Sequence, residues 1–310
     1  MIFSSMSVQL ASLADVAHYL QHQPYALPVL VVILSLLIGS FLNVVILRYP
    51  IMMFRSWLID SKDLADNLPD HPAFQDLDTP YTLSKPSSHC PRCQSPVKAW
   101  QNIPIVSYVL LKGRCAGCAK TGHDTKISLR YPLVEFVTAL LSVALLIKFP
   151  FSIQLGAMLI FTWALVAMSM IDIDHQILPD TMTLSLMWLG LLLNIDHTFV
   201  DLQSAVIGAV AGYLSLWSVF WVFKLLTGKD GMGFGDFKLL AALGAWFGWQ
   251  FLPMIILLSS LVGAAVGIAG IMIMGRDKNI PIPFGPYLAA AGWIAAMWGD
   301  EIMAWYLPAY

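Results

Sequence analysis

Long apolar runs, separated by short polar segments, occupy most of the chain. A helix that crosses the hydrocarbon core of a bilayer needs about 20 mostly apolar residues, so the pattern predicts an all-α integral membrane protein with about eight transmembrane helices. The expected crossings are Ala26–Leu47, Tyr131–Ile147, Phe151–Ile171, Thr181–Ile195, Leu202–Phe223, Leu239–Trp249, Phe251–Met274 and Phe284–Gly299, the last of which continues into Ile302–Leu307.

The sixth of these segments, Leu239–Trp249, has only about half the usual length of a crossing. A re-entrant hairpin formed with the following segment is the alternative, because irregular backbone is tolerated at membrane depth where protein buries it. The distribution of basic residues favours a full crossing. Without it, Arg276 and Lys278 would move to the outer side of the membrane.

Basic residues also orient the chain, because Lys and Arg are enriched in cytoplasmic loops. If the first helix runs from outside to inside and all the segments cross, every Lys and Arg except Lys148 lies on or beside the cytoplasmic side. We therefore expect an extracytoplasmic segment at residues 1–25 and a first transmembrane helix at 26–47. A cytoplasmic domain at 48–130 and a multi-spanning domain at 131–310 would follow.

Composition agrees with a membrane protein and gives no sign of nucleic-acid binding. The chain is 58% hydrophobic and 12% charged, whereas a soluble domain has roughly 25% charged residues. Its net charge is -2. Membrane lipid is therefore an expected partner and nucleic acid is not. Within the cytoplasmic domain, the acidic stretch Ile51–Ser88 is interpreted as largely loop.

Four cysteines form two CxxC pairs in the cytoplasmic domain. They are Cys90 and Cys93, then Cys115 and Cys118. Two such pairs can present four thiolates to one zinc ion, in a closed tetrahedral site that leaves no position for a reactive water. The alternatives are two disulfides, which disagree with a reducing cytoplasm, or free thiols. We predict a structural zinc site.

Carboxylates at the ends of apolar segments are candidates for function, because ionisable groups in a membrane are costly. Asp172 and Asp174 close the third predicted crossing, Asp236 opens the sixth, and Glu135 lies about one turn into the second. Asp180 follows Leu-Pro and is interpreted as an N-terminal helix cap.

Asp172 and Asp236 fall at the same depth, on the same side and on different helices in this topology. Two carboxylates held close can share one proton, so that the ionised one activates water and the neutral one polarises a peptide carbonyl. We expect them to form such a catalytic pair, with Asp174 as the alternative partner of Asp236. Gly233 and Gly235 precede Asp236, and their freedom from side chains would let a substrate strand approach.

The ordered motifs resemble the type IV prepilin peptidases, a family of membrane aspartic proteases with a Gly-x-Gly-Asp motif. That motif is Gly233-Phe234-Gly235-Asp236 here. The other matching segments are Gly39-Ser40-Phe41-Leu42-Asn43-Val44-Val45, the paired CxxC motifs, Arg130-Tyr131-Pro132-Leu133-Val134-Glu135, Asp172-Ile173-Asp174 with Leu178-Pro179-Asp180, and Pro281-Ile282-Pro283-Phe284-Gly285-Pro286. In the family pattern the first Asp of Asp-x-Asp is catalytic, which implies that role for Asp172.

The resemblance implies two activities at the cytoplasmic face of the bacterial inner membrane. The first is cleavage of the basic leader from type IV prepilins and pseudopilins, as needed in pilus biogenesis and type II secretion. The second is N-methylation of the new amino terminus with S-adenosylmethionine. No Gly-rich loop of the dinucleotide type is present to bind this donor. The resemblance alone therefore implies methyl transfer, with the cytoplasmic domain and Glu135 as its expected location.

Three other functions fit parts of the pattern. A preflagellin peptidase would share the aspartates but lack the paired CxxC loop. A proton- or cation-coupled transporter would use the same carboxylates, but is expected to hold them near the midplane on broken helices. A non-catalytic secretion scaffold would need neither aspartate.

Overall fold

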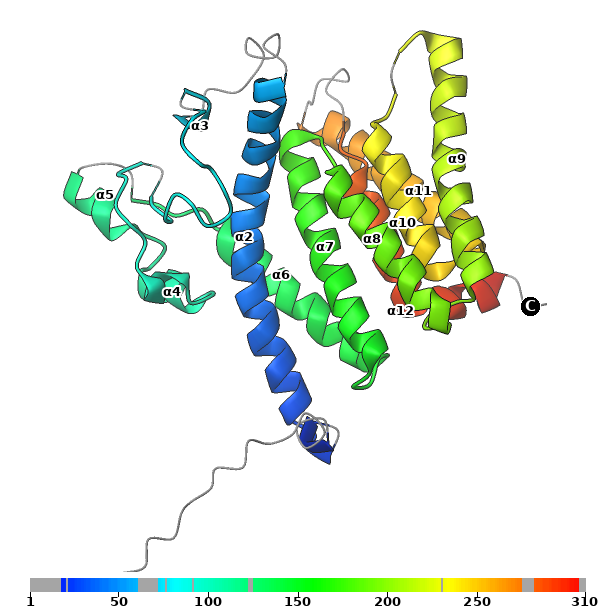
Figure 1. The fold of residues 1–310 in the computed structure, drawn as a ribbon, viewed down its shortest axis with the longest axis horizontal. Coiled ribbons are helices and arrows are strands. Elements are labelled where there is room, and N and C mark those ends of the chain that lie inside the picture. The colour runs from blue at the N-terminus through cyan, green and yellow to red at the C-terminus, as the bar shows by residue number, and fades with distance from the viewer. Residues whose placement is uncertain are drawn as a thin grey trace, which may run out of the picture.

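The computed structural model describes residues 18–20, 22–60, 72–75, 77–90, 92–121, 125–229, 231–274 and 282–306. Most of the expected extracytoplasmic segment 1–25 lies outside these residues. The described part contains helices and no strand, with two isolated bridges in the cysteine-containing region. The prediction of an all-α protein is therefore confirmed (Figure 1).

Eight long helices and several short ones make up the described part of the fold. The long helices are α2 (Ala26–Asp60), α6 (Arg130–Ala144), α7 (Ile153–His175), α8 (Asp180–Leu193), α9 (Leu202–Thr227), α10 (Phe234–Phe247), α11 (Leu252–Met274) and α12 (Gly285–Tyr306). The short ones are α3 (Pro72–Gln75), η2 (Ala99–Asn102), α4 (Val106–Leu110), α5 (Ala116–Thr121), η3 (Leu145–Ile147), η4 (Asn194–Asp196) and η5 (Trp249–Phe251).

Among the residues that the structure describes, five helical stretches are long and apolar enough to cross a membrane, which is the mark of a multi-pass membrane protein. They are Ala26–Asp60, Arg130–Ile147, Ile153–His175, Leu202–Thr227 and Trp249–Ile273. The other three predicted crossings correspond to α8, α10 and α12. The first two of these have only 14 residues each, and α12 has non-helical backbone angles at Trp298.

Helix α2 continues well beyond the predicted end of the first crossing at Leu47. It passes through Pro50 and ends at Asp60, so the interpretation of Ile51–Ser88 as largely loop is wrong for its first ten residues. Arg48 and Arg55 explain the extension. Both are buried, and their guanidinium groups donate to backbone carbonyls of the segment that folds back along the helix, at Ala73, Leu77, Thr79, Thr82 and Leu83.

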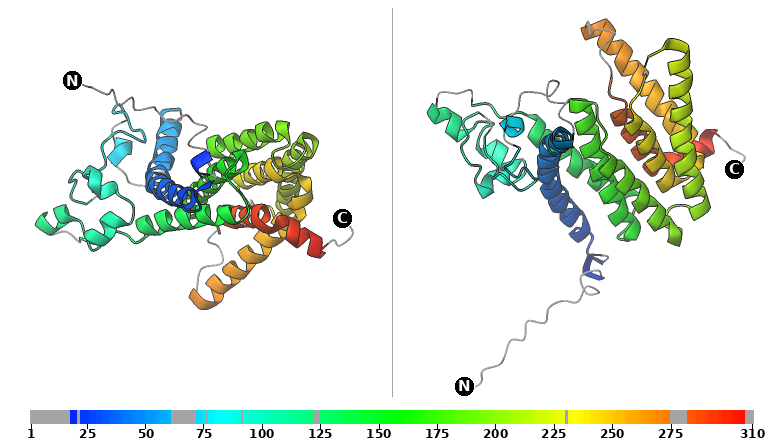
Figure 2. Two further views of the ribbon diagram at one scale, coloured as in Figure 1. Left: turned by 90° about the horizontal axis from the view of Figure 1, so that it is seen from below. Right: turned by 45° about the horizontal axis from the view of Figure 1, so that its top comes forward.

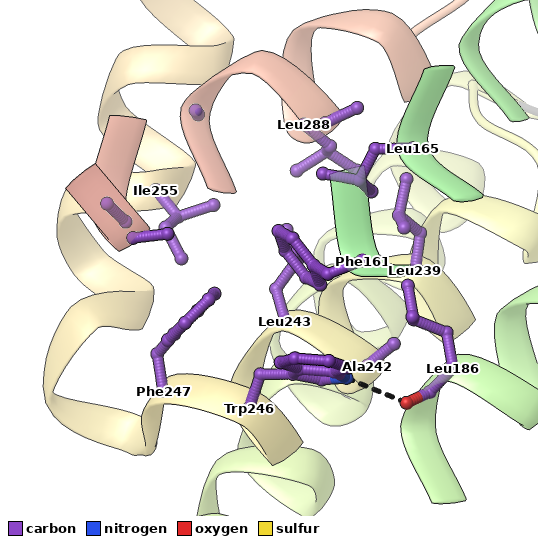
Figure 3. Packing of buried hydrophobic residues seen from close by; sticks show 14 of the residues in the cluster. Phe161, Leu165, Leu186, Leu239, Ala242, Leu243, Trp246, Phe247, Ile255 and Leu288 are labelled. Carbon is purple, nitrogen blue, oxygen red and sulfur yellow. Dashed lines mark hydrogen bonds between the residues drawn. The ribbon is translucent and has the colours of Figure 1, made fainter. Parts of the chain in front are cut away.

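Helix α10 forms the centre of the C-terminal bundle. It packs against α8, α9 and α12, and nearly every residue from Asp236 to Phe247 is buried. Figure 3 shows Leu239, Leu243 and Trp246 of this helix packed among side chains from its neighbours. The indole of Trp246 donates to the carbonyl of Leu186 at 2.8 Å, which satisfies the one polar atom of a fully buried side chain.

Glycines bring α9 and α10 into direct backbone contact. A Cβ atom on Gly244 would lie 2.2 Å from the carbonyl oxygen of Gly208, and one on Gly212 would lie 2.6 Å from that of Leu240. No side chain fits between helices at this separation, and membrane helices commonly use small residues in this way. Helix α11 is packed less closely than α9 and α10. Much of its surface is exposed, and one end stands away from the other helices (Figure 2).

Candidate active site

Asp172 lies in the last turn of α7 and faces the start of α12. Its side chain is buried, and its Oδ2 atom accepts a hydrogen bond from the backbone N–H of Gly285 at 2.9 Å. A Cβ atom on Gly285 would lie only 2.7 Å from the same oxygen. Glycine at 285 is thus what allows the first residue of α12 to donate directly to this carboxylate.

Asp236 lies in the first turn of α10 and is also buried. It is close enough to Asp172 for the charge of one carboxylate to act on the other. The structure therefore brings together the two aspartates that the sequence singled out, from the end of one helix and the start of another. Two carboxylates in such a setting can hold a single proton between them.

Gly233 and Gly235 have different surroundings. Gly235 packs against the loop between α7 and α8, where a Cβ atom would lie 2.7 Å from Cβ of Leu178. Gly233 is exposed, and its added Cβ would make only ordinary contact, 3.7 Å from Oδ2 of Asp236. Only Gly233 leaves open space beside the carboxylate.

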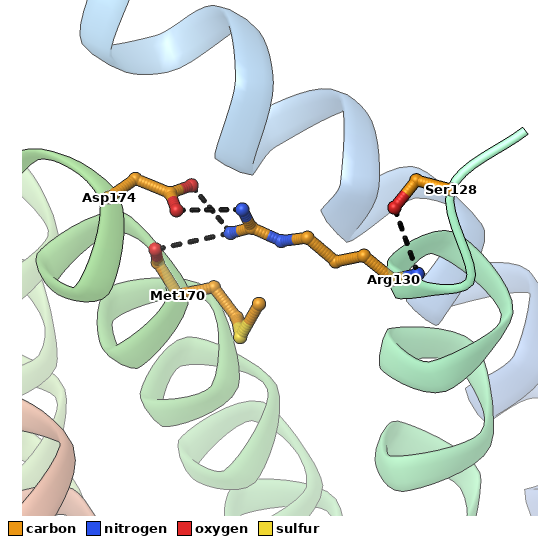
Figure 4. Close-up of polar contacts among 4 residues, drawn as sticks. All are labelled: Ser128, Arg130, Met170 and Asp174. Atoms are coloured by element: carbon orange, nitrogen blue, oxygen red, sulfur yellow. Dashed lines mark hydrogen bonds and ion pairs between the residues drawn. The ribbon is translucent and has the colours of Figure 1, made fainter. Parts of the chain in front are cut away.

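Asp174 points to a different partner. Both of its carboxylate oxygens accept hydrogen bonds from the guanidinium of Arg130, at 2.7 and 2.5 Å (Figure 4). The same guanidinium also donates to the carbonyl of Met170. Arg130 begins α6, so this ion pair ties the N-terminal half of the chain to the helix that carries Asp172.

Asp180 does not cap α8. The cap position is Pro179, and Asp180 is the first helical residue, with its carboxylate paired to the ammonium of Lys238 at 2.6 Å. The reason is geometric. Lys238 lies one turn into α10 and reaches the start of α8, so the side chain of Asp180 turns to it instead of to its own backbone.

The four cysteines converge as expected for a tetrahedral metal site. Their sulfur atoms all lie within 4.8 Å of one another, with 3.6 Å between Cys90 and Cys118 and 3.8 Å between Cys93 and Cys115. Four sulfurs at about 2.3 Å from a zinc ion would be about 3.8 Å apart. A disulfide needs about 2.05 Å, so none of the four is paired in this way.

Ser95 favours the thiolate form of Cys93. Its hydroxyl and backbone N–H lower the pKa of Cys93 to about 6. The thiolate is the form that binds zinc.

Sequence reasoning missed two residues that shape the site. Gly285 was within a matched motif, Pro281–Pro286, but nothing in the pattern indicated that it would meet Asp172. Arg130 was likewise within a matched motif. Its place ahead of an apolar segment was the available signal, since an arginine at such a boundary needs an acidic or carbonyl partner.

Known proteins resemble the chain along most of its length. Residues 159–268 match the type IV leader peptidase family, and residues 33–149 match the bacterial peptidase A24 N-terminal domain. The chain is 52% identical to a prepilin leader peptidase/N-methyltransferase of Stutzerimonas stutzeri and 53% identical to that of Pseudomonas aeruginosa, each over 93% of this chain and 96% of the relative.

The corresponding protein of Aeromonas hydrophila is 53% identical over 96% of this chain and 99% of its own length. No solved structure matches the chain significantly. With two adjoining family domains and relatives of this similarity along nearly its whole length, the chain belongs to the type IV leader peptidase family.

Proposed function

We propose that this protein cleaves the leader peptide from type IV prepilins and pseudopilins and then methylates the new amino terminus, as the names of its relatives describe for them. The observation that carries the cleavage step is that Asp172 and Asp236, both buried and both at helix ends, lie within electrostatic range of each other. A transporter relay is disfavoured, because such carboxylates would lie on helices broken near the midplane.

In the cleavage step, one of the two aspartates is ionised and removes a proton from water. The other holds a proton and polarises the scissile carbonyl. The backbone N–H of Gly285 fixes the orientation of the Asp172 carboxylate. Exposed Gly233 leaves room for the extended leader junction beside Asp236.

In the eight-crossing topology that we propose, this site would lie at the cytoplasmic face of the bacterial inner membrane. The hydrophobic helix of a prepilin can lie in the bilayer, so its leader junction reaches the depth of the two aspartates. The helix ends support this placement, because α7 ends and α10 begins beside the Lys238–Asp180 and Arg130–Asp174 ion pairs.

A zinc ion bound by Cys90, Cys93, Cys115 and Cys118 would hold the cytoplasmic domain together. The sulfur spacing fits a structural site, since four protein ligands complete the tetrahedron. S-adenosylmethionine would supply the methyl group. The buried carboxylate of Glu135, which lies within the matched N-terminal domain, fits a cationic donor or acceptor in that reaction.

Single substitutions of the aspartates test the cleavage assignment. We expect Asp172→Asn and Asp236→Asn each to abolish cleavage of a prepilin added to membranes, while the protein still inserts at wild-type levels. The amide keeps the size of each side chain but cannot share a proton.

Asp174→Asn is the matched control, two residues away on the same helix. It loses the ion pair to Arg130 but not the pair of carboxylates, so we expect it to keep most of the cleavage activity. Cleavage at a near wild-type rate by either Asp172→Asn or Asp236→Asn would refute the catalytic pair. Loss of activity in Asp174→Asn alone would move the assignment to Asp174.

A further inference from the structure

Glu135 is the centre of a second cluster, built from segments that the catalytic pair does not use. The side chain is 7% exposed. Its Oε2 atom accepts a hydrogen bond from the backbone N–H of Ile105 at 2.8 Å, and the Ser40 side chain lies beside the carboxylate. Ser40 lies on α2, Glu135 on α6 and Ile105 just before α4, so three separate segments meet at one carboxylate.

The approach of α2 to α6 is close at this point. A Cβ atom on Gly39 would lie 2.8 Å from Cα of Glu135. The Ser40 hydroxyl also reaches the carbonyl of Asn102 at 3.3 Å, which ties the helix pair to the cytoplasmic domain. Two motifs of the sequence, one around Gly39 and one ending at Glu135, therefore converge here.

The backbone that donates to Glu135 is strained. Ile105 has φ 58° and ψ −48°, a combination that a β-branched residue rarely adopts. Strain of this kind persists where the surroundings impose it, and it clusters at ligand-binding sites. Here it turns the N–H of Ile105 toward the carboxylate.

Glu135 has no cationic partner in the described part of the chain. No ion pair to it occurs among the residues that the structure describes, and Arg130, on the same helix, is committed to Asp174. A buried carboxylate with only neutral donors is costly, and a bound cation would offset that cost. The surface is near, because the neighbouring side chains Ile103 and Val106 are 48% and 51% exposed.

We infer that Glu135 binds a cation that takes part in the methyl-transfer step; this rests on the proposed function. Both reactants of that step are cations: the methyl donor is a sulfonium, and the new amino terminus is an ammonium. The amine loses its proton to solvent and attacks the methyl carbon. The N–C bond forms as the C–S bond breaks, and sulfur keeps the electron pair. Glu135 holds one of the cations in place and is not consumed.

The test uses Glu135→Gln in the full-length protein. The amide keeps the size of the side chain and an acceptor oxygen for the N–H of Ile105, but removes the charge. We expect methylation of cleaved pilin to fall by about ten- to a hundred-fold, as for loss of one charged hydrogen-bonded contact. Cleavage, measured in the same sample, should stay near the wild-type rate. Glu301→Gln, an exposed acid far along the chain, is the matched control.

Binding measurements distinguish the two cations. If Glu135 holds the sulfonium, Glu135→Gln weakens binding of S-adenosylmethionine but not of S-adenosylhomocysteine, which is neutral at sulfur. If it holds the new amino terminus, donor binding is unchanged and the KM for cleaved pilin rises.

Two outcomes overturn the inference: unchanged methylation in Glu135→Gln, or equal loss of cleavage and methylation, which would show a structural role. Absence of both activities in the wild-type protein would instead refute the proposed function.

Discussion

Gly233 and Gly235 stand one residue apart ahead of Asp236, and the structure separates their roles. A side chain at Gly235 collides with Leu178, whereas a side chain at Gly233 meets no atom of the protein closer than 3.7 Å. We expect Gly235→Ala to disturb the start of α10 and to reduce the amount of folded protein.

Gly233→Val tests whether the open space beside Asp236 receives the substrate. We expect it to fold normally and to raise the KM for prepilin, because the valine side chain would occupy the path of the leader. Thermal unfolding in detergent and cleavage kinetics together measure this. A Gly233→Val protein with wild-type kinetics would contradict the proposed path.

The residues that could be predicted from sequence are those whose chemistry is costly in a membrane. Asp172 and Asp236 stood out because each interrupts or borders an apolar run. The sequence could not choose between Asp172 and Asp174, because both lie in one turn of one helix. Their orientations depend on Arg130 and Gly285, which lie 44 and 113 residues from their partners. Contacts over such separations leave no periodic signal.

At the scale of elements, the contact between α9 and α10 depends on glycine. Because a Cβ atom on Gly244 would lie 2.2 Å from a backbone oxygen of α9, the two helices would have to separate to accommodate it. We expect Gly244→Ala to lower the free energy of unfolding by about 1–3 kcal/mol, as overpacking does in protein cores.

Gly156 provides the matched control for this prediction. It lies within α7, and a Cβ atom there would meet no atom within 4 Å. Gly156→Ala should therefore leave the thermal midpoint in detergent unchanged or raise it slightly, since alanine reduces the entropy of the unfolded chain. Equal midpoints for the two variants would show that the helix contact tolerates a side chain.

The proposed zinc site at the four cysteines can be tested by measuring how much zinc the purified protein contains. We expect purified wild-type protein to contain zinc, and Cys93→Ser to contain less zinc and to accumulate to a lower level, because three thiolates leave the tetrahedron incomplete. Cleavage per folded molecule should not change. Metal analysis of Asp236→Asn, which leaves the cysteines intact, is the control. Wild-type protein without zinc would refute the site.

The positions of the long helices could be predicted from the sequence, but the end of α2 could not. Apolar runs located every long helix, because hydrophobic length is a strong signal in membranes. The end of α2 was missed, because Arg48, Pro50 and Arg55 interrupt the apolar run after Leu47. The two arginines hold residues 48–60 helical through contacts with carbonyls up to 35 residues away. These arginine–carbonyl contacts are tertiary interactions, and they extend the helix beyond the end that the hydrophobic pattern predicts.

At the scale of the whole molecule, α10 decides the topology. With 14 residues it is about 21 Å long, shorter than the hydrocarbon core of about 30 Å. If it crosses, the turn at Gln250 faces outward and the loop at Lys229 faces the cytoplasm. We expect a membrane-impermeant maleimide to label Gln250→Cys from outside, and to label Lys229→Cys only after the membrane is disrupted. An unlabelled Gln250→Cys in intact membranes would support a re-entrant hairpin.

The burial of α10 also bears on how the protein is made. A helix that is shorter than the hydrocarbon core and has almost no lipid-facing surface gains little from entering lipid alone. During synthesis, α10 must therefore remain beside α8 and α9, through the glycine contact with the latter, until α12 arrives to close the bundle. The Asp172 carboxylate accepts a hydrogen bond from the first residue of α12, so the orientation of this proposed catalytic group is fixed only after α12 has been made.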